Sequence, residues 1–493
     1  MKSFRLPGPL SPSLAACLLA SAAVTACAPA THISTPDTRL PVAFETPKGT
    51  AINAALPEQA LDKWWLLFDD AQLTSLVEAA LTAAPDARSA AARLEEAEAV
   101  RSQALLPFLP QGNLSGTART SNSRQTTSFA FASPGGQSTS YNLQFNPTWE
   151  LDFMGARHTV RRRADADLAD ARFDVEASRL ALAAQVASDL IQARSIAVQL
   201  ADAQDNARIT RSMADLGKRK SDYGFSPTSD TARLESTALS GEAEVARLDG
   251  ALRGAKRTLL TLVGRGYQPQ DSLTVEPRLA AAPQVPASTP GALLARRPDV
   301  RQAEARLESQ TTTVKLDKLQ LFPNLTLEPG ISFTRSSGVF ESTTRMWSMG
   351  LGATVPILDR PRLLAEIRAQ NARAEQAAVA YEKAVQSAYA DAENTLTTLQ
   401  ADQRRAELLT QAEARSRFAF DAADKGYRAG LTDLTTLLQA EQGWRQARAA
   451  LTNVRTANLQ GAVNAFKALG GGWTPSDVTW KSASSDIKPV AAR

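Results

Sequence analysis

Several segments of the chain alternate between apolar and polar side chains, one residue at a time. The clearest of them begins at Tyr141 and continues through Leu143, Phe145, Trp149 and Leu151, which all fall on one face. Successive side chains of a strand point to opposite faces, so this period of two predicts strands with one apolar and one polar face. The alternation predicts four strands, over about 112–120, 140–153, 324–335 and 346–358.

Two much longer stretches repeat their apolar residues at intervals of three and four. The first runs from Ala156 to about Lys220, and no proline interrupts it. At about 1.5 Å per residue, some 60 residues make a helix of about 90 Å, too long for a globular domain. The pattern therefore predicts a coiled coil or a helical tube. We expect long helices over 156–220 and 362–425, followed by return helices over 228–263 and 432–469.

The two halves of the chain share one design. Pro85-Asp86-Ala87-Arg88 is followed 213 residues later by Pro298-Asp299-Val300-Arg301, and residues 92–95 reappear at the same offset as residues 305–308. Self-similarity at a fixed offset indicates a duplication. We therefore expect a first structural repeat over 61–268, a proline-rich linker over 269–290, a second repeat over 291–472 that opens with a helix over 291–321, and a C-terminal tail over 473–493.

The first 60 residues have the features of a targeting segment and a tether. A positively charged start leads into an apolar stretch from Leu14 to Val24, too short to span a bilayer as a helix. The small residues before Cys27 are similar to a bacterial lipobox, which predicts a signal peptide over 1–26 and a covalent lipid, such as palmitate, on Cys27. The alternative is an ordinary signal peptide with an incidental cysteine. Residues 27–60 are rich in proline and predict an extended tether.

Composition argues against nucleic-acid binding and gives no sign of enzyme chemistry. The 493 residues carry a net charge of only +4, and we find no basic cluster that would bind nucleic acid. The two histidines, His32 and His158, have no neighbouring group of metal ligands. No glycine-rich phosphate loop lies between a strand and a helix. We therefore expect no enzyme activity, no metal and no cofactor other than the lipid on Cys27.

The expected strands are long enough to cross a bilayer, for which about 9–11 tilted residues suffice. Four strands cannot close on themselves, since single-chain barrels start at about eight, and an unpaired sheet edge in lipid is costly. The strands therefore predict that several copies of the chain pool them into one barrel, with the apolar faces toward lipid. The competing interpretation is a soluble sheet that packs one face on helices.

The chain resembles the TolC-like outer membrane efflux family, and specifically its NodT-type lipoproteins, which serve resistance–nodulation–division (RND) pumps. The resemblance covers nearly the whole chain from Cys27 to Trp473. The motifs that carry it are Trp64-Trp65-x-x-Phe68-x-Asp70, the segment from Leu293 to Val300, Phe322-Pro323, Tyr427-Arg428-Ala429-Gly430, and Ala468-Leu469-Gly470-Gly471-Gly472-Trp473.

The resemblance implies a mainly helical fold with transmembrane strands. In the family, three chains with four strands each form one twelve-stranded outer membrane barrel, and the long helices form a tube in the periplasm. A periplasmic adaptor (membrane fusion) protein and an inner-membrane RND pump engage the inner end of the tube. The resemblance thus implies a passive, gated conduit in a tripartite efflux pump, which exports small molecules such as drugs and toxic compounds.

The resemblance also implies where the tube closes. In the family, a tyrosine and an acidic residue on the neighbouring helix hold the tip shut, and they match Tyr427 and Asp230 here. An acidic ring further along falls on Gln439, so the sequence departs from the family there, while Asp433 and Arg428 lie nearby. The alternative for Tyr427 and Asp230 is a helix-turn anchor and an N-terminal helix charge.

Two other functions remain open at this point. A type I secretion channel would keep the conduit and change what passes through it. A periplasmic coiled-coil structural lipoprotein, held to the membrane by Cys27, would explain the lipid and the long helices but not the four strands.

Overall fold

The computed structural model describes residues 36–45, 52–53, 57–123, 136–286, 288–338, 341–478 and 480. The expected signal peptide, Cys27, His32 and most of the expected tether and tail lie outside these residues. The chain divides into two compact units, each assembled from both sequence repeats. Among the described residues, the first unit contains those within Ala99–Asp167 and Arg306–Val379, and the second contains those within Asp37–Glu98, Leu168–Ala305 and from Ala380 onward.

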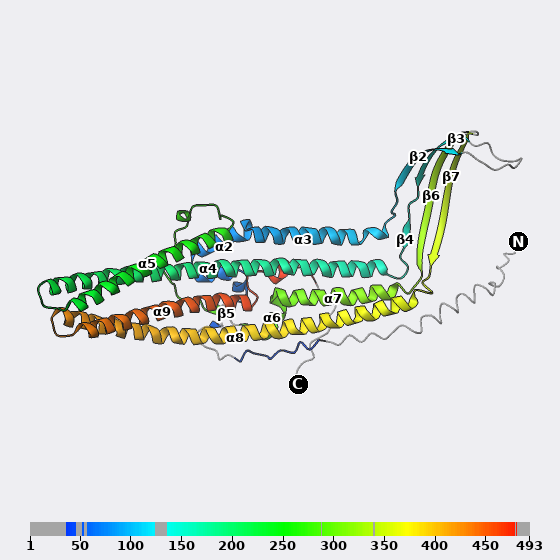
Figure 1. The fold of residues 1–493 in the computed structure, drawn as a ribbon. Coiled ribbons are helices and arrows are strands. Elements are labelled where there is room, and N and C mark those ends of the chain that lie inside the picture. Colours follow the sequence, from blue (N-terminus) through cyan, green and yellow to red (C-terminus); the bar gives the residue numbers. More distant parts are fainter. Residues whose placement is uncertain are drawn as a thin grey trace. The chain divides into compact units, whose positions relative to one another are not determined.

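Long helices make up most of the described chain (Figure 1). The regular elements of the first half are β1 (Ile52–Asn53), α2 (Ala71–Ala83), α3 (Pro85–Ala104), β2 (Leu114–Ser123), β3 (Gly136–Phe145), β4 (Trp149–Leu151), α4 (Ala156–Asp222) and α5 (Thr228–Leu262). Those of the second half are β5 (Val285–Pro286), α6 (Pro290–Arg296), α7 (Pro298–Leu319), β6 (Asn324–Ser337), β7 (Ser342–Thr354), α8 (Arg360–Arg428) and α9 (Leu434–Ala468). Short 3-10 helices are η2 (Glu58–Leu61), η3 (Trp64–Phe68), η4 (Leu106–Phe108), η5 (Gln270–Ser272) and η6 (Pro475–Asp477).

The two longest helices, α4 with 67 residues and α8 with 69, lie where the period of three and four predicts them. The sequence predicts a single helix over 291–321. This prediction is wrong, because two helices, α6 and α7, occupy that stretch. The break falls at Arg297, whose backbone is extended, directly before Pro298. A proline disfavours the helical conformation in the residue before it, which explains why the helix restarts here.

The strand expected over 140–153 is also corrected, because the chain forms β3 and the separate β4 there. Both pair with β6, but residues 146–148 between them do not. Pro147 has no backbone N–H to donate to the ladder, and Thr148 bonds instead to Gln111, ahead of β2. Pro147 occupies an apolar position of the alternation, so the side-chain pattern continues across a backbone break.

The strand expected over 346–358 is displaced, since β7 begins at Ser342 and ends at Thr354. Its first residues are a serine, two threonines and an arginine, which carry no hydrophobic signal, yet the ladder with β6 starts at the Ser336–Ser342 pair. Pro356 lies beyond the strand's end, although the apolar alternation continues to Ile357. Backbone pairing, rather than side-chain pattern, sets both ends of this strand.

The sheet of the first unit is antiparallel and has the order β2, then β3 with β4, then β6, then β7. In the register Ile331 lies between Phe145 and Trp347, and Leu327 between Trp149 and Leu351, so these side chains share one face. This face is exposed in the single chain, with Trp347 at 79% and Leu351 at 70%. The opposite face carries amide, hydroxyl and glycine positions.

The core of the second unit forms around Trp64, which is completely buried. Its ring stacks on Phe466 of α9 at 5.5 Å between centroids and meets Phe68 edge-on at 5.9 Å. Leu73 of α2 and Leu190 of α4 belong to the same cluster. Truncating such a side chain to alanine typically costs about 3–5 kcal/mol, so this cluster is a main source of the unit's stability.

The segments around Trp64 and after α9 close on each other. The amide of Gly472 donates to the carbonyl of Leu61 at 2.8 Å. The indole of Trp473 donates to the carbonyl of Arg296 at 2.9 Å, and the Arg296 guanidinium pairs with Asp62 at 2.9 Å. Gly470 has a φ of +73°, and a Cβ there would lie 2.5 Å from the Arg296 carbonyl oxygen. Three motifs that are remote in sequence therefore form one tightly packed joint.

Candidate functional site

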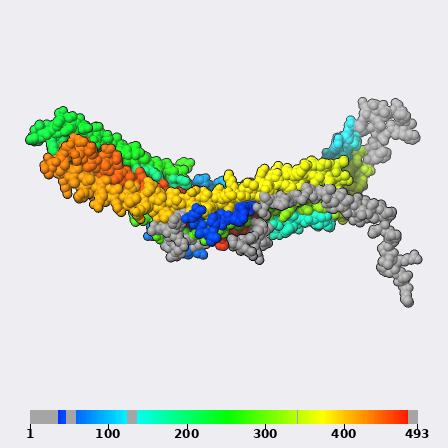
Figure 2. Space-filling view, turned by 90° about the horizontal axis from the view of Figure 1, so that it is seen from below, coloured from blue at the N-terminus to red at the C-terminus, as the bar shows by residue number. Residues whose placement is uncertain are grey.

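The α4–α5 and α8–α9 turns lie side by side in the second unit. Figure 1 places the two turns at the same end of their hairpins, and Figure 2 shows the green surface of α5 against the orange surface of α8 and α9. A small buried cluster joins the hairpins and includes Met213 of α4, Leu234 of α5 and Leu437 of α9. This paired tip contains every candidate gate residue that the sequence analysis names.

Tyr427 is the buried member of the candidate pair, with 7% of its surface exposed. The Nζ atom of Lys220, on α4, lies 4.1 Å from the centre of the Tyr427 ring and donates to the Tyr427 carbonyl at 3.5 Å. Burial raises the pKa of the Tyr427 hydroxyl, and the negative charge of Asp230 raises it further. The tyrosine is therefore held neutral, beneath a lysine that the sequence analysis did not identify.

Asp230 lies in the first turn of α5 and is partly buried. Its carboxylate accepts a hydrogen bond from the Ser226 hydroxyl at 3.4 Å, and it is not hydrogen-bonded to Tyr427 in the structure. The two candidates are thus near enough for their charges to interact, but the single chain does not join them by a direct bond. Their expected role as a gate stays a prediction.

Arg428, Asp433 and Gln439 have separate local surroundings. Arg428 pairs with Asp424 on the same helix at 2.9 Å. Asp433 is the N-cap of α9, where its carboxylate accepts from the Thr436 amide at 2.9 Å. Hydrogen bonds from the Thr436 side chain and then from its amide lower the pKa of Asp433. Gln439 is exposed. In the structure of a single chain these three residues do not converge on Tyr427.

A buried carboxylate that the sequence analysis missed lies just beyond Gln439. Glu441 is 3% exposed, and one of its carboxylate oxygens has no hydrogen-bond partner among the described residues. Burial raises the pKa of Glu441, while the charge of Arg445, whose Nε lies 3.4 Å away, and the side chain of Asn206 lower it. A signal existed, because Glu441 falls between Leu437 and Trp444 in the helical period of buried positions.

A mixed charged and aromatic cluster follows on α9. The Trp444 indole donates to Glu413 of α8 at 2.9 Å and stacks on Phe420 at 5.1 Å. Arg448 lies 5.4 Å from the same indole and pairs with Asp202 of α4 at 2.5 Å. Burial nevertheless raises the pKa of Asp202. These contacts tie α4, α8 and α9 together behind the tip.

A second candidate region is the polar face of the sheet in the first unit. A hollow of about 340 Å³ opens where the ladder breaks between β3 and β4. Its polar lining comes from Gln144, Asn146, Thr148, Glu328, Ser332 and Ser348. A Cβ at Gly330 would lie 2.6 Å from the Ser348 hydroxyl, so a larger residue there would displace that side chain. The face offers hydrogen bonds to water and polar solutes but no cluster of reactive groups.

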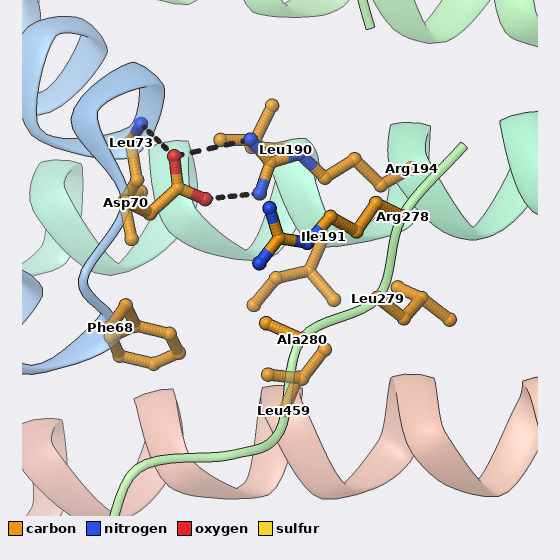
Figure 3. Close-up of a pocket in the computed structure, with 10 residues that line it drawn as sticks. All are labelled: Phe68, Asp70, Leu73, Leu190, Ile191, Arg194, Arg278, Leu279, Ala280 and Leu459. Atoms are coloured by element: carbon orange, nitrogen blue, oxygen red, sulfur yellow. Dashed lines mark hydrogen bonds and ion pairs between the residues drawn. The ribbon is translucent and has the colours of Figure 1, made fainter. Parts of the chain in front are cut away.

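The pocket in Figure 3 has a structural role. Asp70 caps α2 by accepting from the Leu73 amide at 3.0 Å and forms an ion pair with Arg194 of α4, which also bonds Gln72 at 2.8 Å. The cavity beside this pair measures about 20 Å³, room for roughly one water molecule. The cavity is too small for a solute. The helix cap and the ion pair of Asp70 explain why the Trp64 motif ends in an aspartate.

Within the described residues, no group of histidine, cysteine, aspartate and glutamate side chains is arranged to hold a metal ion. None of the helices in the described part of the chain has a stretch long and apolar enough to cross a membrane.

Comparison with known proteins identifies the class of protein. The model of the outer membrane efflux protein family matches residues 76–265 and 289–471, one stretch in each sequence repeat. The chain therefore belongs to the outer membrane efflux protein family, and it is an outer membrane efflux channel.

Individual relatives align with most of the length of this chain. The pyoverdine export outer membrane protein OpmQ of Pseudomonas putida is 29% identical over 476 residues, covering 96% of this chain and 98% of that protein. Nodulation protein T of Rhizobium leguminosarum bv. trifolii is 27% identical and covers 84% of this chain and 88% of its own length. The solved outer-membrane channel OprN matches with a TM-score of 0.77 and 27% identity, over 90% of this chain and 98% of that one. The name of OpmQ describes an export protein, and OprN is described as an outer-membrane channel.

Proposed function

We propose that three copies of this chain form one outer membrane conduit, which receives small molecules from an inner-membrane pump. The observation that carries the proposal is the open sheet of the first unit. Within the described residues, β2 pairs only with β3 and β7 only with β6, so both outer edges of the sheet are unpaired. In a bilayer each unpaired backbone group costs several kcal/mol, so other copies must pair with these edges.

The strand count supports three copies rather than two. Because β3 and β4 pair in succession with β6, they count as one strand position, and each chain supplies four. Two copies would pool eight strands, and the interior of an eight-stranded barrel is just wide enough for its own side chains. Three copies pool twelve strands, which leaves space for a water-filled lumen. The exposed apolar face of Ile331, Trp347 and Leu351 then faces lipid, and the polar hollow beside Asn146 faces the lumen.

The paired helix turns form the periplasmic end of the conduit. A periplasmic adaptor protein and an RND pump engage this end, and the pump supplies the energy, so the channel itself is passive. The export role in the name of OpmQ and the family match support a small molecule as the cargo. Tyr427 and Asp230 gate the tip, and a lipid on Cys27 adds a second attachment to the membrane.

Two measurements test the conduit. Native mass spectrometry of the detergent-extracted protein should give three times the chain mass, with each chain lacking residues 1–26 and carrying lipid on Cys27. The same protein should produce discrete conductance steps in a planar bilayer. A stable single chain without conductance would reject the conduit and favour a periplasmic structural lipoprotein. A Cys27→Ser variant that kept its lipid mass would reject the attachment site alone.

A further inference from the structure

The apolar face of the sheet carries two arginines at one end. The strands β2, β3, β4, β6 and β7 contain only three basic residues, Arg119, Arg335 and Arg345. In the register Arg335 lies opposite Tyr141 and Arg345 opposite Phe333, on the face of Ile331 and Trp347. Arg119 pairs with Ser140 and falls on the polar face. Both outward arginines therefore lie on the face expected to meet lipid.

The two arginines are neighbours across the ladder. Arg335 is opposite Thr343, two residues from Arg345 on β7, and such diagonal positions on one face are about 7–8 Å apart. The Arg345 guanidinium lies 5.9 Å from the centre of the Phe333 ring. Contact with a ring face leaves the N–H groups at the edge of a guanidinium available as donors. One headgroup can therefore reach both side chains.

Both guanidinium charges are exposed and lack a carboxylate partner among the described residues. The nearest acidic positions on these strands, Glu328 and Glu150, lie on the polar face. Glu341 lies beyond the last pair of the β6–β7 ladder and forms no ion pair with either arginine. The face thus presents two positive charges to whatever lies against it.

The level of the arginines along the strands matches a membrane boundary. The apolar row from Leu325 to Phe333 rises by roughly 27 Å along the strand, or about 20 Å after a tilt of about 40°, close to the ~25 Å apolar band of membrane barrels. Tyr141 and Trp347 flank the arginines, as aromatic residues do at membrane interfaces. Beyond them the face continues with Thr139 and Ser337.

The pair also lies at a defined end of the sheet. The helices that adjoin this sheet, α3, α4, α7 and α8, meet the strands at the end of Leu325, while Arg335 and Arg345 approach the hairpin end. At the helical end, the row of Leu151, Leu325 and Ala353 carries no charge. If the helices extend into the periplasm, as the proposed function requires, the arginines lie in the outer leaflet of the membrane.

We propose that Arg335 and Arg345 bind the phosphate groups of a lipid headgroup in the outer leaflet, and that its acyl chains pack against Ile331 and Trp347. The inference rests on the proposed barrel. Guanidinium groups bind phosphate oxygens through paired, charge-assisted hydrogen bonds, so a glycolipid that carries two phosphates, such as lipid A, fits this pair. Choline headgroups add a positive charge and fit less well.

Binding of lipid A to the purified protein tests the inference. Native mass spectrometry should detect lipid A on the wild-type protein and about tenfold weaker binding to the double variant R335Q/R345Q, since two charge-assisted contacts are lost. The matched control R119Q, on the polar face of the same sheet, should bind like the wild type. Equal binding by the double variant, or an equal loss in R119Q, would overturn the site.

Two further arms keep the result interpretable. Wild-type protein should bind monophosphoryl lipid A more weakly than lipid A, which tests the phosphates without any mutation. Excess inorganic phosphate should not displace lipid A, and complete displacement would reject a lipid site in favour of a simple anion site. Subunit number and conductance of the double variant should be unchanged. If the wild-type protein itself were not a trimer and gave no conductance, the barrel on which the inference rests would be rejected.

Discussion

The α4–α5 and α8–α9 turns have the same backbone conformation but differ in their side chains. In both, a glycine at positive φ, Gly224 at +77° or Gly430 at +76°, ends the long helix. The following amide, of Phe225 or Leu431, bonds back to a carbonyl five residues earlier at 2.8 Å. Phe225 and Leu431 are both more than 80% exposed. Duplication has therefore kept the turn, and the residues around it set its role.

Two contrasts distinguish the turns. Tyr223, beside the first turn, is 77% exposed, whereas Tyr427, before the second, is 7% exposed. The return helix α5 follows Pro227, which gives no side-chain cap, whereas α9 is capped by Asp433. These contrasts separate a turn whose tyrosine is exposed from one whose tyrosine is buried against the neighbouring hairpin.

The largest expected effect concerns the buried tyrosine. The double change Asp230→Ala and Tyr427→Phe should raise the conductance or open probability of the reconstituted channel. A loss of about 1 kcal/mol of closed-state preference raises the ratio of open to closed channels roughly fivefold. The control is Tyr223→Phe at the exposed turn, which should change nothing. Unchanged conductance in the double variant would leave Tyr427 and Asp230 as a helix-turn anchor.

A smaller effect is expected from the buried carboxylate. Glu441 on α9 and Glu235 on α5 lie at the same distance from their turn glycines, but Glu441 is buried and Glu235 is exposed. Glu441→Gln should raise the free energy of unfolding at neutral pH by about 1 kcal/mol, because a buried and incompletely bonded charge is removed. Glu235→Gln should have no effect in the same denaturant titration.

The pH dependence of Glu441 has a definite sign. Because burial raises its folded pKa above the ordinary glutamate value, the folded state holds the proton more tightly than the unfolded state. The destabilisation by the ionised form is fully present above the folded pKa and disappears as pH falls toward the unfolded pKa. The advantage of Glu441→Gln should therefore shrink on acidification, and an advantage independent of pH would contradict this assignment.

The smallest effect concerns the cap. Asp433→Ala should lower the melting temperature at neutral pH, since the Thr436 amide loses its acceptor, and Asp433→Asn should lose less because it keeps an acceptor. The pKa of Asp433 is lowered in the folded state, so its contribution is present above the unfolded pKa and is lost as pH falls through the folded one. Equal melting curves for Asp433→Ala and wild type would show that the cap is dispensable.

The sequence predicted this fold where a pattern persisted over many residues. The long helices followed from a period maintained across dozens of positions, and the strands from an alternation of two. The pattern failed at Pro147 and at Ser342, because hydrogen bonding of the backbone decides there and side-chain hydrophobicity does not report it. The long helix expected over 291–321 failed at Arg297 for a local reason, the proline that follows.

The candidate site was less predictable than the fold. Tyr427 and Asp230 entered through resemblance to a family, and no spacing in the sequence could place Lys220 over the Tyr427 ring, because 207 residues separate them. Glu441 could have been found, since it follows Leu437 and precedes Trp444 at helical intervals. A carboxylate in an apolar row is a signal for a perturbed pKa, while of the partners that tune it Arg445 is on the same helix and Asn206 comes from α4.

The joint between Asp62 and the residues after α9 has a consequence for biogenesis. The carboxylate of Asp62 accepts a hydrogen bond from Thr474 at 3.2 Å across a separation of 412 residues, and Trp64 stacks on Phe466. The core around Trp64 therefore lacks the residues that α9 contributes until nearly the whole polypeptide has been synthesised. We therefore expect the helical unit to complete its fold only after nearly the whole chain has been made.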